Sequence, residues 1–484
     1  MIESPLLKHM SGYIGGKWVD ADSGDTFAVM NPANGKELAQ VPRMGEAETR
    51  RAIAAAKGAL QMRPDREVCR EWLEDIAQAL IDEKTEVGRI LCLEHGKPWK
   101  EAEGEAAYAA GFFSNCAKNI DALAPHKLDE RPRDCKWTTH YRPIGVSGLI
   151  TPWNFPIGMI AKKLAPALAA GCPVVIKPAS ETPLTMIALF TLIHERLELP
   201  EGMVNLVMGS ASEIGGALCD SPDVPMLSFT GSTEVGINLI ENTASQVKKL
   251  ALELGGNAPF IVFEDADLDA AADNLIANKF RGSGQTCVCA NRIYAHADVA
   301  DAFVEKVVSR VKSMNVGDGM DEKTDMGPLI NKAGFNKVRD HLKDALDHGA
   351  QLEAGKHPDD LDAEDGLFFP PTVISGVTHE MACTREETFG PLVPVVRFDR
   401  DEQAIEFGNK TEFGLAAYVF TKNKERAREV IANLRFGHVG LNTGTGPTPE
   451  APFGGMKLSG IGREGGTEGL FEYVEAQTVP RSKN

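Results

Sequence analysis

A short segment with two cysteines, residues 284–289, carries the most nucleophilic side-chain type in the sequence. Cys287 and Cys289 stand one residue apart there, and residues 281–285 before them are small and polar, unlike a core strand. A zinc site would need further His or Cys ligands at matching short spacing, and none follows. A thiolate nucleophile needs backbone donors and a nearby base. The pattern leaves two interpretations open, an inert buried thiol and a reactive nucleophile.

Two polar residues occur where the sequence is otherwise apolar. Glu253 ends an apolar stretch, where contact with solvent is not assured, and Asn154 lies in an apolar segment between Pro152 and Pro156. Each residue alone is ambiguous between a structural and a chemical role.

A glycine turn around Gly231 is the best candidate for binding a phosphate. It follows a predicted strand and opens a predicted helix, so Gly231 would let the backbone approach a ligand and the helix N-terminus would offer free N–H groups. The alternative is that Gly231 merely ends the strand. The ordinary dinucleotide fingerprint, a Walker A loop and a nucleophile elbow are all absent from the sequence.

The composition is that of an acidic globular protein with more than one domain. The chain has 484 residues, 43% of them hydrophobic and 25% charged, and a formal net charge of −18. This charge argues against nucleic acid or an anionic membrane as a partner, but a few basic groups in a pocket could still hold a small anion. An odd number of cysteines, nine, indicates reduced thiols. With no apolar leader or long apolar span apparent, we expect a cytoplasmic protein.

The pattern of elements predicts an α/β fold. Residues 12–44 look β-rich with a turn at residues 31–35, and residues 46–96 are helical by periodicity. Short apolar strands alternate with helices over residues 144–252 and again over residues 258–420, which is typical of parallel sheets covered on both faces. The predicted elements include strands at residues 144–150, 226–229, 249–252 and 416–420 and a helix at residues 184–196. Residues 437–455 are rich in Gly, Thr and Pro and predict a long loop, a common place for function.

Six motifs, in order along the chain, resemble the aldehyde dehydrogenase superfamily. They are Trp153-Asn154, Lys177-Pro178, Phe229-Thr230-Gly231-Ser232, Glu253-Leu254-Gly255-Gly256, Gly284-Gln285-Thr286-Cys287 and Glu387-Thr388-Phe389-Gly390-Pro391. The resemblance runs over residues 14–475. Within the superfamily, residues 280–292 look most like the succinate-semialdehyde dehydrogenases.

The resemblance implies three structural parts. These are a cofactor domain with a Rossmann-type parallel sheet (residues 1–124 and 146–255), an α/β catalytic domain (256–455) and a β oligomerisation arm (125–145 and 456–484). The polar stretch 125–136 would lead into the arm, and a strand near residues 473–478 would complete it. A homodimer or homotetramer is implied.

The resemblance also implies the chemistry. Cys287 would attack an aldehyde carbonyl to give a thiohemiacetal. The side chain of Asn154 and the backbone N–H of Cys287 would hold the oxyanion. After hydride transfer to a nicotinamide cofactor, Glu253 would activate the water that hydrolyses the thioester. No metal is expected.

The remaining motif residues would bind the cofactor. Lys177 resembles the ribose-binding lysine of the family, Gly231 and Ser232 would lie by the pyrophosphate, and Glu387 and Phe389 would position the nicotinamide end. Trp153 and Leu254 would also line the cofactor site; the alternative for the aromatic residues Trp153 and Phe389 is a structural role in the core. NAD-preferring relatives often carry a glutamate where this chain has Ser180, so NADP is expected to be accepted and preferred over NAD.

The substrate would be an aldehyde with an anionic tail. Arg281 matches the arginine that holds the distal carboxylate in resembling succinate-semialdehyde dehydrogenases. Two departures weaken the match to succinate semialdehyde itself: Lys162 replaces a second arginine, and Pro447 replaces a serine. Glutarate semialdehyde or a sulfonated analogue therefore remains open. A reversible Cys287–Cys289 disulfide is a further expectation.

Two alternative functions stay open on the sequence. One is a member that transfers the acyl group to CoA, which the glutamate at position 253 disfavours. The other is a non-enzymatic relative, which would be expected to lack the thiol or the base, and both are present.

Overall fold

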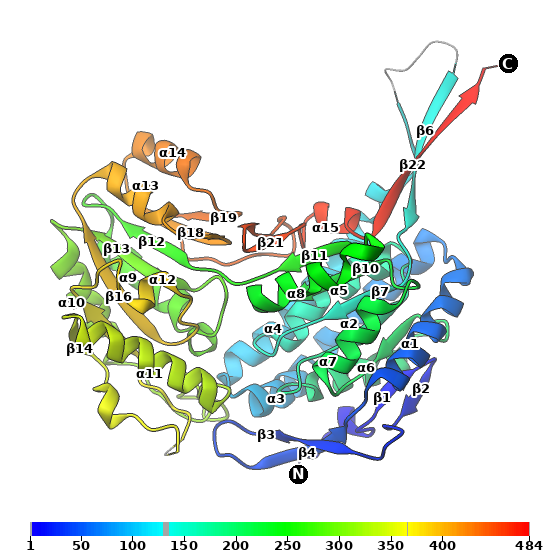
Figure 1. The fold of residues 1–484 in the computed structure, drawn as a ribbon, viewed down its shortest axis with the longest axis horizontal. Coiled ribbons are helices and arrows are strands. Elements are labelled where there is room, and N and C mark those ends of the chain that lie inside the picture. Colours follow the sequence, from blue (N-terminus) through cyan, green and yellow to red (C-terminus); the bar gives the residue numbers. More distant parts are fainter. Residues whose placement is uncertain (1, 129–134, 365, 484) are drawn as a thin grey trace.

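Two helix-covered sheets form the body of the molecule, and a ribbon of strands projects from it (Figure 1). The structure, a computed structural model, describes residues 2–128, 135–364 and 366–483. It confirms the expected α/β architecture with two mostly parallel sheets.

The first sheet has eight strands in the order β2-β1-β9-β8-β7-β10-β11-β21. Five of them are parallel: β7 (Ser147–Ile150), β8 (Val174–Lys177), β9 (Val204–Leu206), β10 (Met226–Thr230) and β11 (Lys249–Glu253). The antiparallel edges are β1 (Gly12–Ile14), β2 (Lys17–Val19) and β21 (Gly460–Ile461). The central strands are buried almost throughout, as expected for a sheet covered on both faces.

Alternate residues of these strands face two separate cores. Val174 and Ile176 pack with one layer of helices, and Val175 packs with the other. The first layer contains α2 (Arg66–Asp82), α3 (Lys84–His95), α4 (Trp99–Asn119), α5 (Pro156–Ala169) and α6 (Leu184–Arg196). The second contains α1 (Glu46–Ala59), α7 (Ala211–Asp220) and α8 (Thr233–Thr243).

The second sheet has seven strands in the order β14-β15-β16-β13-β12-β18-β19. Their bounds are β12 (Ala258–Val262), β13 (Ala290–His296), β14 (Gln351–Ala354), β15 (Thr372–Ser375), β16 (Leu392–Phe398), β18 (Ala416–Phe420) and β19 (His438–Leu441). Only β14 is antiparallel to its neighbour. One face carries α9 (Leu268–Lys279) and α10 (Ala300–Val311), and the other carries α11 (Lys332–Asp347), α13 (Asp401–Asn409) and α14 (Lys424–Asn433).

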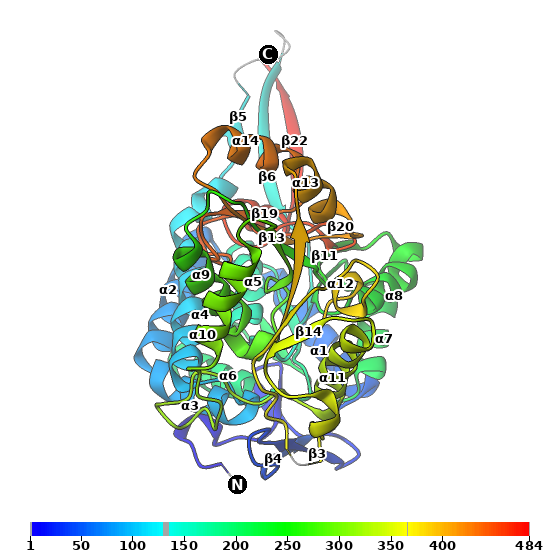
Figure 2. The same ribbon diagram turned by 90° about the vertical axis from the view of Figure 1, so that its left-hand side faces the viewer.

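The projecting ribbon is an antiparallel sheet of three strands, β22-β6-β5 (Figures 1 and 2). Its strands are β5 (His126–Lys127), β6 (Cys135–Pro143) and β22 (Val474–Ser482). The predicted polar stretch 125–136 leads into it, although residues 129–134 lie outside the described residues.

Residues 456–473, assigned to the arm from the sequence, contact the body instead. Gly460–Ile461 (β21) pairs with β11, and Met456–Lys457 (β20) pairs with Phe413–Gly414 (β17). These strands are two residues long and rich in glycine, so they leave no alternating pattern in the sequence.

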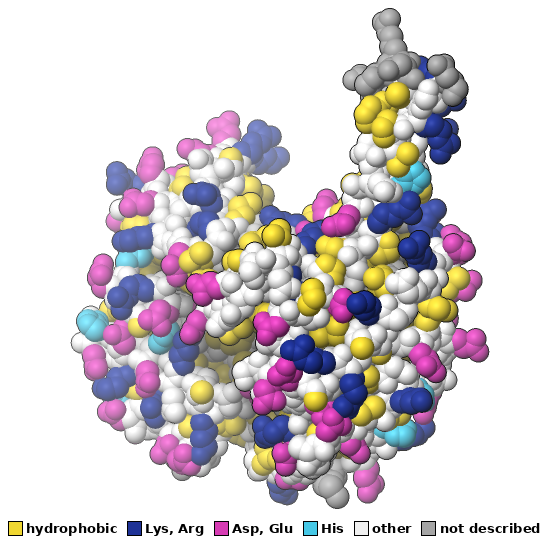
Figure 3. Space-filling model, turned by 45° about the vertical axis from the view of Figure 1, so that its right-hand side comes forward, with side chains coloured by type: hydrophobic (Ala, Val, Ile, Leu, Met, Phe, Trp, Pro, Cys, Tyr) yellow, Lys and Arg dark blue, Asp and Glu magenta, His cyan; other side chains and the backbone are white. Residues whose placement is uncertain are grey.

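Short elements complete the chain. A hairpin joins β3 (Thr26–Met30) to β4 (Glu37–Pro42) through the turn predicted at residues 31–35. The short helices α12 (Ala382–Arg385) and α15 (Glu468–Phe471) lie in connecting segments. Among the described residues, no helix combines the length and apolarity needed to cross a bilayer. Basic and acidic side chains are interspersed over the face shown in Figure 3.

Candidate active site

The loop that carries Cys287 begins with a tight turn after α9. In the segment Arg281–Gly284, Gly282 and Ser283 have φ values of 55° and 60°. Ser283 adopts this left-handed conformation although it has a side chain, and its hydroxyl donates to the carbonyl of Gly327 at 2.9 Å. The fold thus holds a strained turn directly before the nucleophile candidate.

Cys287 lines a small cavity between the two sheets. The other lining residues are aromatic, apolar or cationic, except the polar Thr286: Tyr108, Phe155, Met159, Lys162, Arg281, Val288, Pro447 and Phe453. Burial raises the pKa of the Cys287 thiol to about 12, and the carboxylates of Glu387 and Glu253 act in the same direction while Lys162 opposes them. The thiol is therefore protonated at neutral pH and needs a base to become a nucleophile.

Asn154 lies against this loop from the first sheet. Its Nδ2 donates a hydrogen bond to the carbonyl of Gln285 at 2.9 Å, and the residue is buried. The backbone N–H of Cys287 has no acceptor among the described residues. The second N–H of the Asn154 amide and this backbone N–H are available to an oxyanion.

Glu253 ends β11, opposite Thr230 on β10. It is 4% exposed, and its Oε2 has no hydrogen-bond partner. Burial, and then the carboxylate of Glu464, raise the pKa of Glu253 well above its usual value. Three residues later, Gly256 packs directly against the loop that carries Cys287. A Cβ at Gly256 would lie only 2.5 Å from the carbonyl oxygen of Cys287. The structure thus brings Glu253, Asn154 and Cys287 to one place.

Two further charged residues, missed from the sequence, lie beside Glu253. Glu464 accepts a hydrogen bond from Nζ of Lys163 at 2.6 Å, and Nζ of Lys162 lies 3.8 Å from its other oxygen. The signal in the sequence was a pair of lysines inside an apolar helix, since a buried lysine requires a partner. That partner, 301 residues away from Lys163, could not be identified.

Lys162 and Arg281 both face the Cys287 cavity. Nζ of Lys162 lies 4.7 Å from the ring centroid of Phe453, and the Arg281 guanidinium lies 4.7 Å from that of Phe155. Burial acts to lower the pKa of Lys162, but its anionic neighbours, among them Glu464, leave that pKa raised. No carboxylate among the described residues forms an ion pair with Arg281.

Pro447 also lines the cavity. It contributes a backbone carbonyl, which accepts a hydrogen bond from the hydroxyl of Tyr108 at 3.2 Å. Pro447 therefore cannot supply the side-chain hydroxyl that is expected at this position from the resemblance to succinate-semialdehyde dehydrogenases.

The predicted phosphate and ribose residues lie at the carboxyl edge of the first sheet. Lys177 ends β8, is 6% exposed, and donates to the carbonyl of Pro178 at 3.0 Å. Burial lowers the pKa of Lys177. Ser180 is exposed, and Ser232 caps α8, accepting a hydrogen bond from the N–H of Val235. A Cβ at Gly231 would collide with the ring of Phe229, so the turn requires glycine.

The segment between α12 and β16 closes this edge. Glu387 accepts a hydrogen bond from the N–H of Gly256 at 3.1 Å, and burial raises its pKa to about 7. Phe389 has a φ of 56°, and its ring meets that of Trp153 edge-on at 5.7 Å between centroids. Leu254 is buried. This edge offers hydrogen-bond donors that fit a dinucleotide: the backbone N–H groups of an exposed helix N-terminus and a glycine turn, and the ammonium of a buried lysine.

Cys289 differs from Cys287 in its surroundings. Its Sγ donates to the carbonyl of Asn278 at 3.0 Å and is buried. Both cysteines are free thiols in this structure. Within residues 2–128, 135–364 and 366–483, no cluster of three His, Cys, Asp or Glu side chains is arranged to hold a metal ion.

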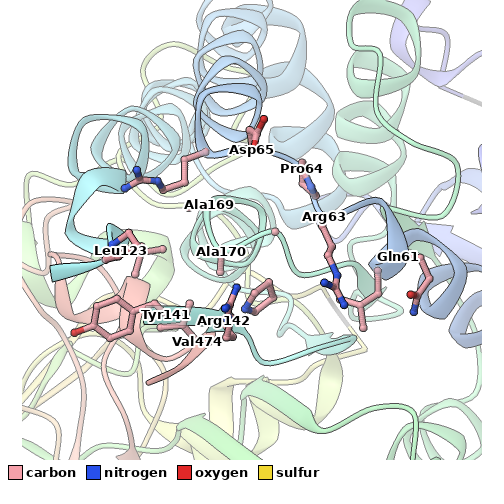
Figure 4. A pocket seen from close by; sticks show the side chains of 15 residues that line it. Gln61, Arg63, Pro64, Asp65, Leu123, Tyr141, Arg142, Ala169, Ala170 and Val474 are labelled. Atoms are coloured by element: carbon pink, nitrogen blue, oxygen red, sulfur yellow. The ribbon is translucent and has the colours of Figure 1, made fainter. Parts of the chain in front are cut away.

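A cavity much larger than the one beside Cys287 lies elsewhere. It has a volume of about 700 Å³ and is found at the base of the projecting ribbon, where Arg63, Asp65, Leu123, Tyr141 and Arg142 line it (Figure 4). None of the predicted site residues contributes to it. Cavity size alone would therefore have misplaced the site.

Comparison with known proteins identifies the family. The model of the aldehyde dehydrogenase family matches residues 18–479. The chain is 46% identical to a glutarate-semialdehyde dehydrogenase of Pseudomonas putida, with 98% of each chain covered. It is 44% identical to a 3-sulfolactaldehyde dehydrogenase of Pseudomonas putida (99% of this chain, 98% of the relative). It is 45% identical to the NADP-dependent succinate-semialdehyde dehydrogenase of Escherichia coli, with 97% of each covered.

A solved structure shows the same fold over the full length. The oxidoreductase from Marinobacter aquaeolei superposes with a TM-score of 0.98, at 67% identity and with 100% of both chains covered. The chain therefore belongs to the aldehyde dehydrogenase family and is an NAD(P)-dependent aldehyde dehydrogenase.

Proposed function

We propose that this enzyme oxidises a small aldehyde with an anionic tail to the carboxylic acid, and that it uses NADP in preference to NAD. The observation that carries the proposal is a pair of cations, Arg281 and Lys162, in the same cavity as Cys287. Arg281 forms no ion pair with a carboxylate among the described residues, so its guanidinium is available to a ligand.

Cys287 and Asn154 serve the first step. Sγ of Cys287 loses its proton to a base and bonds to the carbonyl carbon, and the carbonyl oxygen becomes an oxyanion. The Asn154 amide and the backbone N–H of Cys287 donate to that oxygen, each contributing roughly 3–4 kcal/mol in the transition state. A nicotinamide, when bound, would supply the acceptor for the hydride that this carbon loses as it becomes the thioester carbon on Cys287.

Glu253 serves the second step. Its unpartnered carboxylate takes a proton from water, whose oxygen then attacks the acyl carbon and displaces the Cys287 thiolate. Its raised pKa makes it a stronger base than an exposed glutamate. The same glutamate disfavours the alternative in which CoA accepts the acyl group.

The kind of anionic tail is left open among three candidates. Relatives named for glutarate semialdehyde, 3-sulfolactaldehyde and succinate semialdehyde are 46%, 44% and 45% identical, so identity does not separate them. A lysine at position 162 offers a point charge without the planar fork of arginine, and Pro447 offers no hydroxyl. These features support an anionic tail that could differ from succinate semialdehyde in length or kind, with succinate semialdehyde, glutarate semialdehyde and a sulfonated aldehyde as the candidates.

The cofactor preference rests on Ser180. Its small exposed hydroxyl neither repels a 2′-phosphate nor fills the volume of one, and Lys177 lies at the end of the adjoining strand. The relative from Escherichia coli is named as NADP-dependent, which supports the same preference.

The arm supports a homo-oligomer. Strands β6 and β22 project from the body and leave most of their residues exposed or half-exposed, an arrangement that a second copy of the chain would cover. We keep the division into a cofactor domain, a catalytic domain and an arm, with residues 456–473 moved from the arm to the body.

A panel of aldehydes tests the proposal. Reduction of NADP is followed at 340 nm with succinate semialdehyde, glutarate semialdehyde, a sulfonated aldehyde and the uncharged butanal, each with and without CoA. We expect kcat/KM to be about tenfold or more higher for at least one anionic aldehyde than for butanal, independent of CoA. Equal values for charged and uncharged aldehydes would contradict the proposal.

A further inference from the structure

A buried ion pair, Lys97 with Glu105, lies behind the active site. Nζ of Lys97 is 2.5 Å from Oε2 of Glu105, and the two side chains are 0% and 1% exposed. Removing both charges from water offsets most of the attraction between them, so stability alone does not account for such a pair. The other hydrogen bonds of Lys97 and Glu105 show which parts of the main chain the pair contacts.

Lys97 holds the main chain of Asn154. Its Nζ donates to the Asn154 carbonyl at 2.8 Å and lies 4.0 Å from the ring centroid of Phe155. The side chain of Asn154 is held separately, by its hydrogen bond to the carbonyl of Gln285. Asn154 is thus held by hydrogen bonds at both its main-chain carbonyl and its side-chain amide.

Glu105 holds the start of the helix that follows Asn154. Its Oε1 accepts hydrogen bonds from the N–H groups of Ile157 and Gly158, each at 3.1 Å. The first turn of α5 has no side-chain cap of its own: Phe155 stands at the N-cap, and Pro156 has no N–H. A carboxylate from α4 therefore satisfies these donors and faces the positive end of the helix dipole.

One turn earlier on α4, Glu101 reaches the opposite wall of the cavity. Its Oε2 accepts a hydrogen bond from the N–H of Gly282, next to Arg281. Residues four apart lie on the same face of a helix. A single face of α4 thus contacts both the Asn154 segment and the turn that precedes Cys287.

We propose that Lys97 and Glu105 are positioning residues that hold the Asn154 amide where the oxyanion forms. The inference rests on the proposed role of Asn154 in aldehyde oxidation. Neither residue touches the aldehyde or the thiol; both act through Asn154, by fixing its carbonyl and the first turn of α5.

A double-mutant cycle tests the coupling. The paired substitution Lys97→Met with Glu105→Gln removes both charges, keeps the volume, and leaves no buried charge unpaired. We expect kcat with the best anionic aldehyde to fall about tenfold or more, with KM for NADP changed less than about twofold. In the Asn154→Ala background, the same pair should lower kcat by less than about twofold, because the group it positions is gone.

Folding is measured separately, by Tm and circular dichroism. Glu48→Gln is the matched control, because Glu48 is another buried carboxylate that accepts two backbone N–H groups, one of them from Gly45 at the start of α1. It should lower Tm without changing kcat. If the paired variant does not fold, Glu105→Asp enters the same cycle with the same expected pattern, because it keeps the charge opposite Lys97 and shortens the side chain that reaches the N–H groups of Ile157 and Gly158.

Two results would overturn the inference in distinguishable ways. An equal loss of kcat with and without Asn154 would show that the pair acts on general structure, and the proposed function would stand. An unchanged kcat for Asn154→Ala would remove the oxyanion role of Asn154 itself, and the inference with it.

Discussion

The cofactor side and the aldehyde side of the Cys287 thiol are formed by different kinds of structural element. On the cofactor side, the predicted contacts come from strand ends, a glycine turn and a helix N-terminus, with Ser180 and Ser232 exposed. On the aldehyde side, long side chains from three separate elements converge: Tyr108 from α4, Lys162 from α5 and Arg281 from the turn after α9. The first side uses backbone geometry that the fold itself provides, and the second depends on the identity of each side chain.

This contrast separates cofactor binding, which the fold itself supports, from substrate selection, which depends on individual side chains. Backbone donors at a sheet edge bind phosphates in any member that keeps the fold. A cavity lined by two cations and several aromatic rings selects among aldehydes. Substitutions on the aldehyde side should therefore change which substrate is used, and substitutions on the cofactor side should change which dinucleotide is preferred.

The largest effect is expected where the two sides meet. Cys287→Ala removes the proposed nucleophile and should lower kcat by about 10⁴-fold or more, while NADPH binding, measured by fluorescence, stays intact. Cys289→Ala is the matched control, because its Sγ donates to the carbonyl of Asn278 and Cys289 does not line the Cys287 cavity, so the variant should keep most activity. An inactive Cys289→Ala with an active Cys287→Ala would reverse the assignment.

The thiol pKa predicts a steep pH dependence. With the pKa of Cys287 raised to about 12, the thiolate fraction rises about tenfold for each pH unit between 7 and 9. The rate of alkylation by iodoacetamide without cofactor should therefore rise about 100-fold over that range, measured by loss of activity. A plateau below pH 8 would mean that Lys162 lowers the thiol pKa far more than burial raises it.

A substitution on the cofactor side tests the same contrast through the preference for NADP over NAD. Ser180→Glu places a carboxylate where a 2′-phosphate is expected, so the ratio of kcat/KM for NADP over NAD should fall about tenfold. KM for the aldehyde should stay within about twofold. Ser23→Glu, at an exposed serine between β2 and β3, is the control. A wild type with a strong NAD preference would make the prediction wrong at the outset.

The smallest effect concerns redox control. Mild peroxide should inactivate the enzyme through a Cys287–Cys289 disulfide, and dithiothreitol should restore activity. Cys289 must first leave its hydrogen bond to Asn278, so the inactivation should be slow. In Cys289→Ala the recovery should be lost. Inactivation of the wild type that no thiol reductant reverses would indicate over-oxidation of Cys287 instead.

Much of the fold follows from local sequence. The helix predicted at residues 184–196 is confirmed at both ends, and strands β10, β11 and β18 lie where apolar runs predicted them. The strand predicted from residue 144 begins at Ser147, because the N–H of Ile144 is taken by the carbonyl of Tyr473. A pairing over more than 300 residues leaves no local signal.

The site divides in the same way. Cys287, Asn154 and Glu253 could be predicted because short motifs surround them, and the structure brings them together. Lys97, Glu105 and Glu464 could not, because each acts through partners that lie far away in sequence: 57 residues from Lys97 to Asn154, and 301 from Lys163 to Glu464. Charged residues in buried segments indicate that partners exist but do not name them.

The central claim is that Arg281 selects the anionic tail, and one comparison tests it most directly. KM is measured for wild type and Arg281→Ala with the best carboxylated aldehyde and with butanal. The account predicts that KM rises about tenfold or more, about 1.4 kcal/mol, for the carboxylated aldehyde and barely changes for butanal. An equal loss on both substrates would contradict it and would mean that Arg281 supports the turn before Cys287.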